Sequence, residues 1–106
     1  MNTPTITDPL TCLRVVGSSM IAPEGARYSF PDGMLLYVKP AQDWTPGKFV
    51  IVQRAGKPGK MFRRLTAIDG ELFLKALNPE HPDRCMKLQP DDTLCGVVVQ
   101  AGFDLP

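Results

Sequence analysis

The chain has 106 residues, with 12 Lys or Arg and 11 Asp or Glu, so its formal net charge is +1. This length fits a single domain, and the balanced charge provides no concentrated basic face of the kind that binds nucleic acid. No apolar run approaches the roughly 20 residues of a membrane helix, and residues 1–9 lack the pattern of a signal peptide. We therefore expect a cytoplasmic protein that binds neither DNA directly nor a membrane.

The cysteines give no sign of a disulfide framework or a metal site. Cys12, Cys85 and Cys95 are odd in number, and their separations match no paired metal-ligand spacing. Reduced cysteines are typical of cytosolic proteins. We expect no metal, no cofactor and no small-molecule ligand.

In chain order, the sequence predicts a flexible tail over residues 1–9 and one domain over residues 10–106. The 11 prolines and 9 glycines favour turns over long helices. Apolar or alternating runs predict strands over residues 10–16, 34–39, 48–54, 60–67, 71–77 and 94–101. Residues 18–32 and 78–90 are interrupted by Pro or Gly and are predicted to be irregular.

Turn signals separate these strands. Pro31-Asp32-Gly33 and Thr45-Pro46-Gly47 are typical turn sequences, and Asp69-Gly70 is the strongest hairpin signal in the chain. Short strands joined in this way predict an all-β domain, either a partly closed barrel or paired small antiparallel sheets.

Several short motifs gain meaning from their order. A serine that follows a strand is by itself most often a turn former or a helix cap. Here the serine is followed by further motifs, and the ordered set is Val16-Gly17-Ser18-Ser19-Met20, Phe30-Pro31-Asp32-Gly33-Met34-Leu35, Pro46-Gly47, Arg63-Arg64-Leu65, Leu77-Asn78-Pro79 with His81-Pro82, and Gly96-Val97-Val98. This set resembles the C-terminal domain of LexA-like proteins, which include LexA, UmuD and the lambdoid phage repressors and are related to the signal peptidases. The resemblance covers roughly residues 13–101.

The resemblance assigns roles to three residues. Ser19 matches the nucleophile of a Ser–Lys peptidase, Met20 the residue that lines the cleft beside it, and Arg63 the general-base lysine. A buried lysine is neutral often enough to accept the serine proton, whereas arginine keeps its charge in proteins. We therefore expect an inactive pair, in which Arg63 either bonds to Ser19 and fills the cleft or turns towards solvent.

Lys60 is the alternative base. It precedes Arg63 by an odd number of positions in a predicted strand, so alternation places it on the opposite face. Only a β-bulge would bring its amine to Ser19. An active peptidase that uses Lys60 remains the alternative to an inactive cleft.

The resemblance also implies a cleavage segment, which this sequence lacks. Family repressors cut themselves at an Ala-Gly or Cys-Gly bond before the serine, whereas the sequence before Ser19 contains only Val16-Gly17. It also shows no helix-turn-helix pattern. The chain is either a domain cut from a repressor or a short natural protein that pairs with a full-length relative, and the initial Met1 favours the latter.

These observations predict a dimerisation module of a phage or prophage repressor system, within transcription regulation of the SOS type. The apolar final strand predicts the interface, with Leu94, Val97, Val98 and Val99 as its residues. The partner would be a second copy or a full-length helix-turn-helix repressor. A UmuD-like accessory subunit of a DNA polymerase is a further alternative, which co-purification with polymerase would support.

Overall fold

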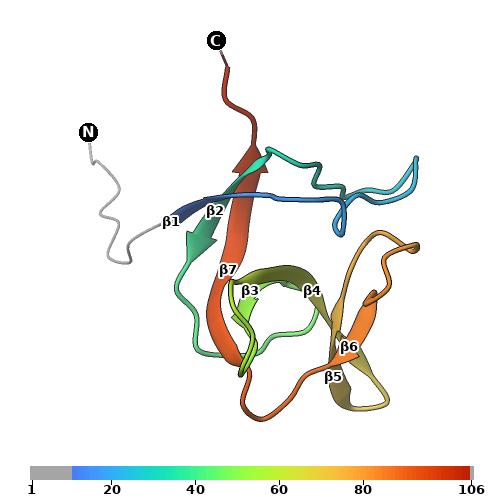
Figure 1. The fold of residues 1–106 in the computed structure, drawn as a ribbon, viewed down its shortest axis with the longest axis vertical. Helices are drawn as coiled ribbons and strands as arrows, with labels where there is room; N and C mark the ends of the chain where they lie inside the picture. Colours follow the sequence, from blue (N-terminus) through green and yellow to red (C-terminus); the bar gives the residue numbers. More distant parts are fainter. Residues whose placement is uncertain (1–10, 106) are drawn as a thin grey trace.

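The computed structural model describes residues 11–105. This part of the chain forms strands and contains no helix, so the all-β prediction is confirmed (Figure 1). The tail predicted over residues 1–9 lies outside the described residues. Within the described range, no helix is long and apolar enough to span a bilayer. The strands are β1 (Thr11–Arg14), β2 (Leu35–Lys39), β3 (Phe49–Gln53), β4 (Met61–Ile68), β5 (Glu71–Lys75), β6 (Cys85–Lys87) and β7 (Thr93–Gly102).

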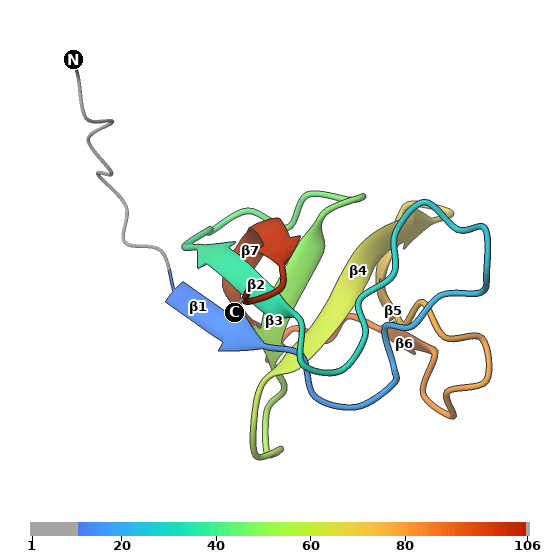
Figure 2. The ribbon, with the colours of Figure 1, turned by 90° about the horizontal axis from the view of Figure 1, so that it is seen from above.

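The strands form one antiparallel sheet in the order β1-β2-β7-β3-β4-β5-β6. The register shifts between Tyr37 and Val38 in β2 and between Ile51 and Val52 in β3. Irregularities of this kind bend strands and increase their twist. The sheet is strongly curved, as the view from above shows (Figure 2). As a result, residues of β1 and β4 line one cavity although three strands separate them in the sheet. We call this opening between β1 and β4 the seam.

Strand β7 is long enough to pair with two neighbours in succession. Thr93–Val97 pairs with β3, and Val97–Gly102 pairs with β2. A glycine is needed near the change of partner, because a Cβ atom on Gly96 would lie 2.5 Å from Val38 Cγ1 and 2.8 Å from the Lys39 carbonyl oxygen. Beyond Val97, the edge of β7 that faces away from β2 has no backbone partner among the described residues.

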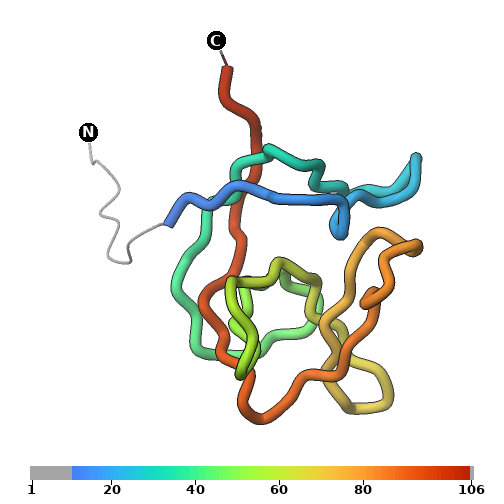
Figure 3. The backbone as a smooth tube through the Cα atoms, viewed as in Figure 1, coloured from blue at the N-terminus to red at the C-terminus, as the bar shows by residue number. Residues whose placement is uncertain are grey.

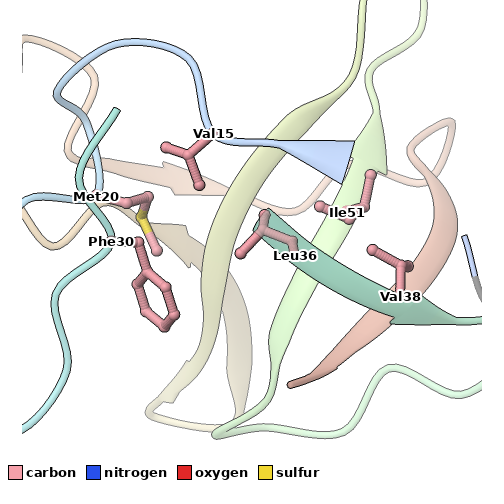
Figure 4. Close-up of a cluster of buried hydrophobic side chains, with 6 residues drawn as sticks. All are labelled: Val15, Met20, Phe30, Leu36, Val38 and Ile51. Atoms are coloured by element: carbon pink, nitrogen blue, oxygen red, sulfur yellow. The ribbon is translucent and has the colours of Figure 1, made fainter. Parts of the chain in front are cut away.

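Two apolar clusters pack against the two faces of the sheet, and alternate residues of β3 contribute to one or the other. Ile51 belongs to the first cluster, whereas Val50 and Val52 belong to the second with Leu65 and Leu74. Period-2 alternation along β3 explains this division. The first cluster gathers around the seam (Figure 4) and consists of Val15, Met20, Phe30, Leu36, Val38 and Ile51.

The predicted hairpin at Asp69-Gly70 is present. Ile68 pairs with Glu71 across a two-residue turn, and both turn residues have positive φ, 52° at Asp69 and 81° at Gly70. This is the type I′ pattern, whose twist matches that of the flanking strands.

The prediction of irregular structure over residues 78–90 is wrong for β6. Cys85, Met86 and Lys87 pair with Lys75, Leu74 and Phe73 of β5. Three residues are too few for alternation to be detected in the sequence, so only the pairing with β5 defines this strand.

Candidate functional site

Ser19 lies in the loop after β1, and the motif around Asp32 shapes that loop. The backbone of Val15 donates to Met34 O and accepts from Gly33 N, which extends the pairing with the β2 side. Gly17 then adopts a φ of 85° and donates its N–H to Asp32 Oδ1 over 2.7 Å. This positive φ suits glycine and turns the chain into the loop that carries Ser19.

Asn78 fixes the Ser19 loop from the other side. Its backbone N–H donates to Ser19 O, and its Nδ2 donates to Ser18 O, each over 3.0 Å. Asn78 Oδ1 accepts from Glu80 N, so the loop after β5 is tied to itself as well. The two loops lie side by side in the backbone trace (Figure 3). This clamp determines where the serine hydroxyl lies.

Met20 anchors the same loop in the core. Its side chain is buried within the first apolar cluster, and its carbonyl accepts a hydrogen bond from Phe30 N. Met20 and Ser19 both line the same cavity. The close-up shows Met20 with Val15, Leu36 and Ile51 (Figure 4), which line this cavity as well.

Arg63 lies on β4 opposite Val50 and is buried, with an exposed fraction of 6%. Its Nη1 donates to Ser19 Oγ over 3.0 Å and to Phe62 O over 2.8 Å. Its Nε has no hydrogen-bond partner. Of the two arrangements that the sequence allows, the structure therefore has the one in which Arg63 bonds to Ser19.

Burial lowers the pKa of Arg63 from its ordinary value, and the charge of Asp83 raises it in part. The guanidinium starts from so high a pKa that it remains protonated at physiological pH. Arginine also has only donors, so Ser19 Oγ is the acceptor of their hydrogen bond. Arg63 therefore cannot take the proton of Ser19.

Lys60 is one of the residues that border the Ser19 cavity. It precedes the first residue of β4 and follows Gly59, which has a φ of 76°. Because Lys60 is outside the regular strand, alternation does not determine its direction. Lys60 is exposed and borders the same cavity as Ser19 and Arg63, but the hydrogen bond to Ser19 comes from Arg63.

The cavity has a volume of about 310 Å³ and opens along the seam. Its lining combines apolar side chains with three cationic residues and has no acidic residue; the lining residues are Leu13, Arg14, Val15, Val16, Ser19, Met20, Leu36, Ile51, Lys60, Met61, Phe62 and Arg63. No cluster of potential metal ligands is found among residues 11–105.

Comparison with known proteins shows the family of the chain. Residues 2–99 match the family described as Peptidase S24-like. The chain belongs to this family. The resemblance inferred from the ordered motifs is thereby confirmed.

The relatives of this S24-like chain include transcriptional regulators of mobile elements. It is 37% identical over 89 residues to "Repressor protein C2" of Salmonella phage P22, a match that covers 84% of the chain and 39% of the relative. It is also 37% identical over 93 residues to the "HTH-type transcriptional regulator for conjugative element R391" of Providencia rettgeri, covering 87% and 41%. A Vibrio cholerae regulator for element SXT matches equally. The chain thus spans about two fifths of the length of these relatives.

The four residues predicted to form the interface differ in packing and exposure. Leu94 and Val97 pack against the second apolar cluster, and Val98 packs against the first. Val99 is exposed, with an exposed fraction of 56%. On the side where β3 pairs with Thr93–Val97, the edge of β7 has no strand partner after Val97 among the described residues.

A groove of about 490 Å³ runs beside this open part of β7 and was not predicted from the sequence. Val98–Ala101 forms one side of it, and Tyr28, Phe49 and Arg64 contribute to the rest. The Arg64 guanidinium lies over the rings of Phe49, 5.1 Å from the centroid, and Tyr28, at 5.8 Å. Tyr28 follows a glycine- and proline-rich stretch with no strand pattern, so no local signal could have placed it beside β7.

Asn78 and Asp32 are further residues of the site, and both lie in motifs that support the family resemblance. The motifs alone do not predict what either side chain binds. The structure shows that both position the Ser19 loop. His81, the one histidine, accepts from Asp83 N within its own loop and does not line the Ser19 cavity.

Proposed function

We propose that this chain is a self-association domain of a repressor system of a phage or related mobile element, and that its peptidase cleft no longer cuts peptide bonds. The relatives named above support the regulatory context. In such a system the domain would pair with a second copy or with a helix-turn-helix repressor and would leave DNA contact to that repressor. We place this activity in the cytoplasm, where transcription regulators act.

The proposed self-association rests on the open edge of β7. Residues 98–102 offer unpaired backbone groups on one side, and an unpaired strand edge is a template for pairing with another chain. Two such edges related by a twofold axis would make an isologous contact, the commonest form of homodimer. Exposed apolar side chains continue beyond the strand, at Phe103 and Leu105.

Sedimentation at tens of micromolar protein tests this interface with a matched pair of variants. Val99→Asp places a charge at the open edge, and Ile68→Asp makes the same change at another exposed β-branched residue, at the end of β4. We expect wild type and Ile68→Asp to sediment as dimers and Val99→Asp as a monomer. A wild-type monomer, or equal behaviour of the two variants, would contradict the proposed interface.

The proposed loss of cleavage rests on the hydrogen bond between Arg63 and Ser19. General-base catalysis requires a group that accepts the nucleophile's proton, and here the group bonded to Ser19 Oγ can only donate. Lys60 favours the second candidate, an active Ser–Lys peptidase, because it borders the same cavity. The cleavage assay described in the Discussion separates the two.

A further inference from the structure

A positively charged surface outside the Ser19 cavity lies on strands β4 and β5. The register places Arg64 opposite Phe49 on one side and opposite Lys75 on the other. Like charges directly opposite each other in an antiparallel sheet are destabilising. The chain therefore has, at this position, a pair of cations that its own fold does not favour.

Aromatic rings restrain two arginines at this surface. The Arg64 guanidinium lies 5.1 Å from the ring centroid of Phe49 and 5.8 Å from that of Tyr28. The Arg27 guanidinium lies 5.3 Å from the centroid of the same Tyr28 ring. Tyr28 and Phe49 contact each other edge to face. A guanidinium that lies over a ring is held in place, while the N–H groups at its edge stay available for an acceptor.

No counter-ion balances these charges within the described part of the domain. Among residues 11–105, the side chains of Arg27, Arg64 and Lys75 form no ion pair. No acidic residue lines the two pockets that border them. The formal net charge of +1 does not reveal this grouping, because the acidic residues lie elsewhere in the fold.

The two pockets combine the cations with apolar side chains. One has a volume of about 450 Å³ and the other about 460 Å³, and both are lined by Arg64, Lys75 and Leu77. Neither contains a residue of β7, so this surface is separate from the proposed self-association edge. The apolar part of the first pocket includes Ala22, Pro23, Ala26 and Ala76, and that of the second includes Pro46 and Leu65.

We propose that the surface formed by Arg27, Arg64 and Lys75 binds an acidic, partly apolar segment of a partner protein. Asp and Glu carboxylates accept paired N–H groups from the edge of a guanidinium. Apolar side chains between those carboxylates would enter the two pockets. A bound acidic segment would also reduce the repulsion between Arg64 and Lys75. This binding goes beyond self-association and does not depend on it.

Nucleic acid is the other polyanion that a cationic surface attracts, and two features disfavour it here. Proteins bind single strands with exposed ring faces on which bases stack, whereas arginines lie over the rings of Tyr28 and Phe49. Binding to duplex DNA relies on contacts to about 6–10 phosphates, and this surface offers three cations. The apolar pockets have no counterpart on a phosphate backbone.

The test compares three peptides of equal length with blocked ends. The acidic probe is Glu-Leu-Asp-Glu-Leu-Asp-Glu; the second peptide replaces its acids with Gln and Asn, and the third replaces its leucines with Ser. Each is titrated at low ionic strength into ¹⁵N-labelled wild-type protein while the amide resonances of residues 22–28, 64–67 and 75–77 are followed. We expect the neutral peptide to bind about tenfold more weakly or worse, and the serine peptide severalfold more weakly.

Three outcomes of these titrations would overturn the proposal. The first is equal binding of the acidic and neutral peptides. The second is no binding of the acidic peptide at millimolar concentration. The third is tighter binding of an oligothymidylate strand or a short DNA duplex at the same resonances, which would show a nucleic-acid site instead.

A matched pair of variants distinguishes the site from general attraction. Lys75→Glu and Lys57→Glu make the same charge change at two exposed lysines, and Lys57 lies outside both pockets. We expect Lys75→Glu to weaken the acidic peptide about tenfold and Lys57→Glu to leave its binding nearly unchanged. Equal losses in the two variants would show a general charge effect and refute the site.

Stability provides a readout that a merely structural role of Lys75 would move the other way. Lys75→Glu places opposite charges across from each other at Arg64, so it should raise the midpoint of urea unfolding while it loses peptide binding. A lower midpoint would show that Lys75 serves the fold and contradict the proposal. Its sedimentation should match that of wild type, so this proposal and the one for β7 can fail separately.

Arg64→Lys tests the restrained guanidinium itself. Lysine keeps the positive charge but lacks the planar group that lies over a ring and pairs with a carboxylate through two N–H groups. We expect this variant to bind the acidic peptide severalfold more weakly than wild type. Binding equal to that of wild type would mean that the arginine geometry plays no part and would contradict the proposed mode of recognition.

Discussion

The guanidinium of Arg63 donates a 3.0 Å hydrogen bond to the hydroxyl oxygen of Ser19, although 44 residues separate the two in the chain. The direction of this bond is fixed, because arginine has no acceptor. In a Ser–Lys pair the serine would donate its proton towards a neutral amine. Here the side chain in the position of the base holds the serine oxygen and leaves the serine proton free, so the pair suits binding better than catalysis.

The first prediction concerns cleavage. A peptide that contains an Ala-Gly bond, supplied in trans, should not be cut by wild-type protein even at about pH 10, because Arg63 stays protonated there. The Arg63→Lys variant should cut it at high pH, since a neutral lysine can act as the base, and general-base catalysis typically contributes about 10²–10⁴ in rate. Product formation is followed by mass spectrometry, with Ser19→Ala as the blank.

Lys60→Ala is the matched control for this assay. Wild-type cleavage that disappears in both Ser19→Ala and Lys60→Ala would show that Lys60 is the base, as its place at the cavity allows. That result would establish the active-peptidase alternative and contradict the inactive cleft.

The second prediction concerns how stability depends on pH. Burial lowers the pKa of Arg63 from its ordinary value, but arginine keeps its charge in proteins, so the group is protonated in both the folded and the unfolded chain. In wild type, this residue should therefore add no pH dependence to the free energy of unfolding between pH 7 and 10. In Arg63→Lys the same burial should lower the lysine pKa in the folded state below its unfolded value of about 10.4.

Between those two pKa values, the unfolded Arg63→Lys chain binds more protons than the folded one. Its free energy of unfolding should then rise with pH, by at most about 1.4 kcal/mol per pH unit relative to wild type. Urea unfolding at pH 7, 8, 9 and 10 measures the difference. Parallel curves for the two proteins would show that the site does not desolvate a cation.

The third prediction concerns the Asn78 clamp. Asn78→Ala removes the Nδ2 bond to Ser18 O and the acceptor for Glu80 N, and should lower the free energy of unfolding by about 1–3 kcal/mol. Asn78→Asp keeps the acceptor and loses the donor, so it isolates the bond to the Ser19 loop. Hydrogen exchange over residues 18–21 should increase in both variants. Unchanged exchange in Asn78→Asp would show that the side-chain donor does not hold this loop.

The fourth prediction concerns the hairpin between β4 and β5. Gly70→Ala forces alanine into a φ of 81° and should cost roughly 1 kcal/mol or more, measured by urea unfolding. Gly102→Ala is the control, because a Cβ there meets nothing within 4 Å and its φ is not in the positive range. Equal effects of the two substitutions would mean that backbone conformation does not limit the turn.

Local sequence patterns are enough to predict the all-β class, the hairpin at Asp69-Gly70 and the family, whose resemblance assigns Ser19 and Arg63 to the positions of nucleophile and general base. Alternation and turn chemistry are local, so short stretches of residues are enough to reveal them. The ordered motifs were specific because each occupies a defined place in one fold, even though every motif alone is weak.

How these parts are brought together depends on the tertiary structure. Sheet curvature brings β4 to the loop after β1 and buries Arg63 against Ser19, which no local pattern determines. The strand β6 exists only through its pairing with β5, and Lys60, which directly precedes β4, borders the same cavity as Ser19. The open half of β7 likewise depends on a change of partner near Gly96. These features depend on contacts between residues far apart in the chain, which no local sequence pattern reveals.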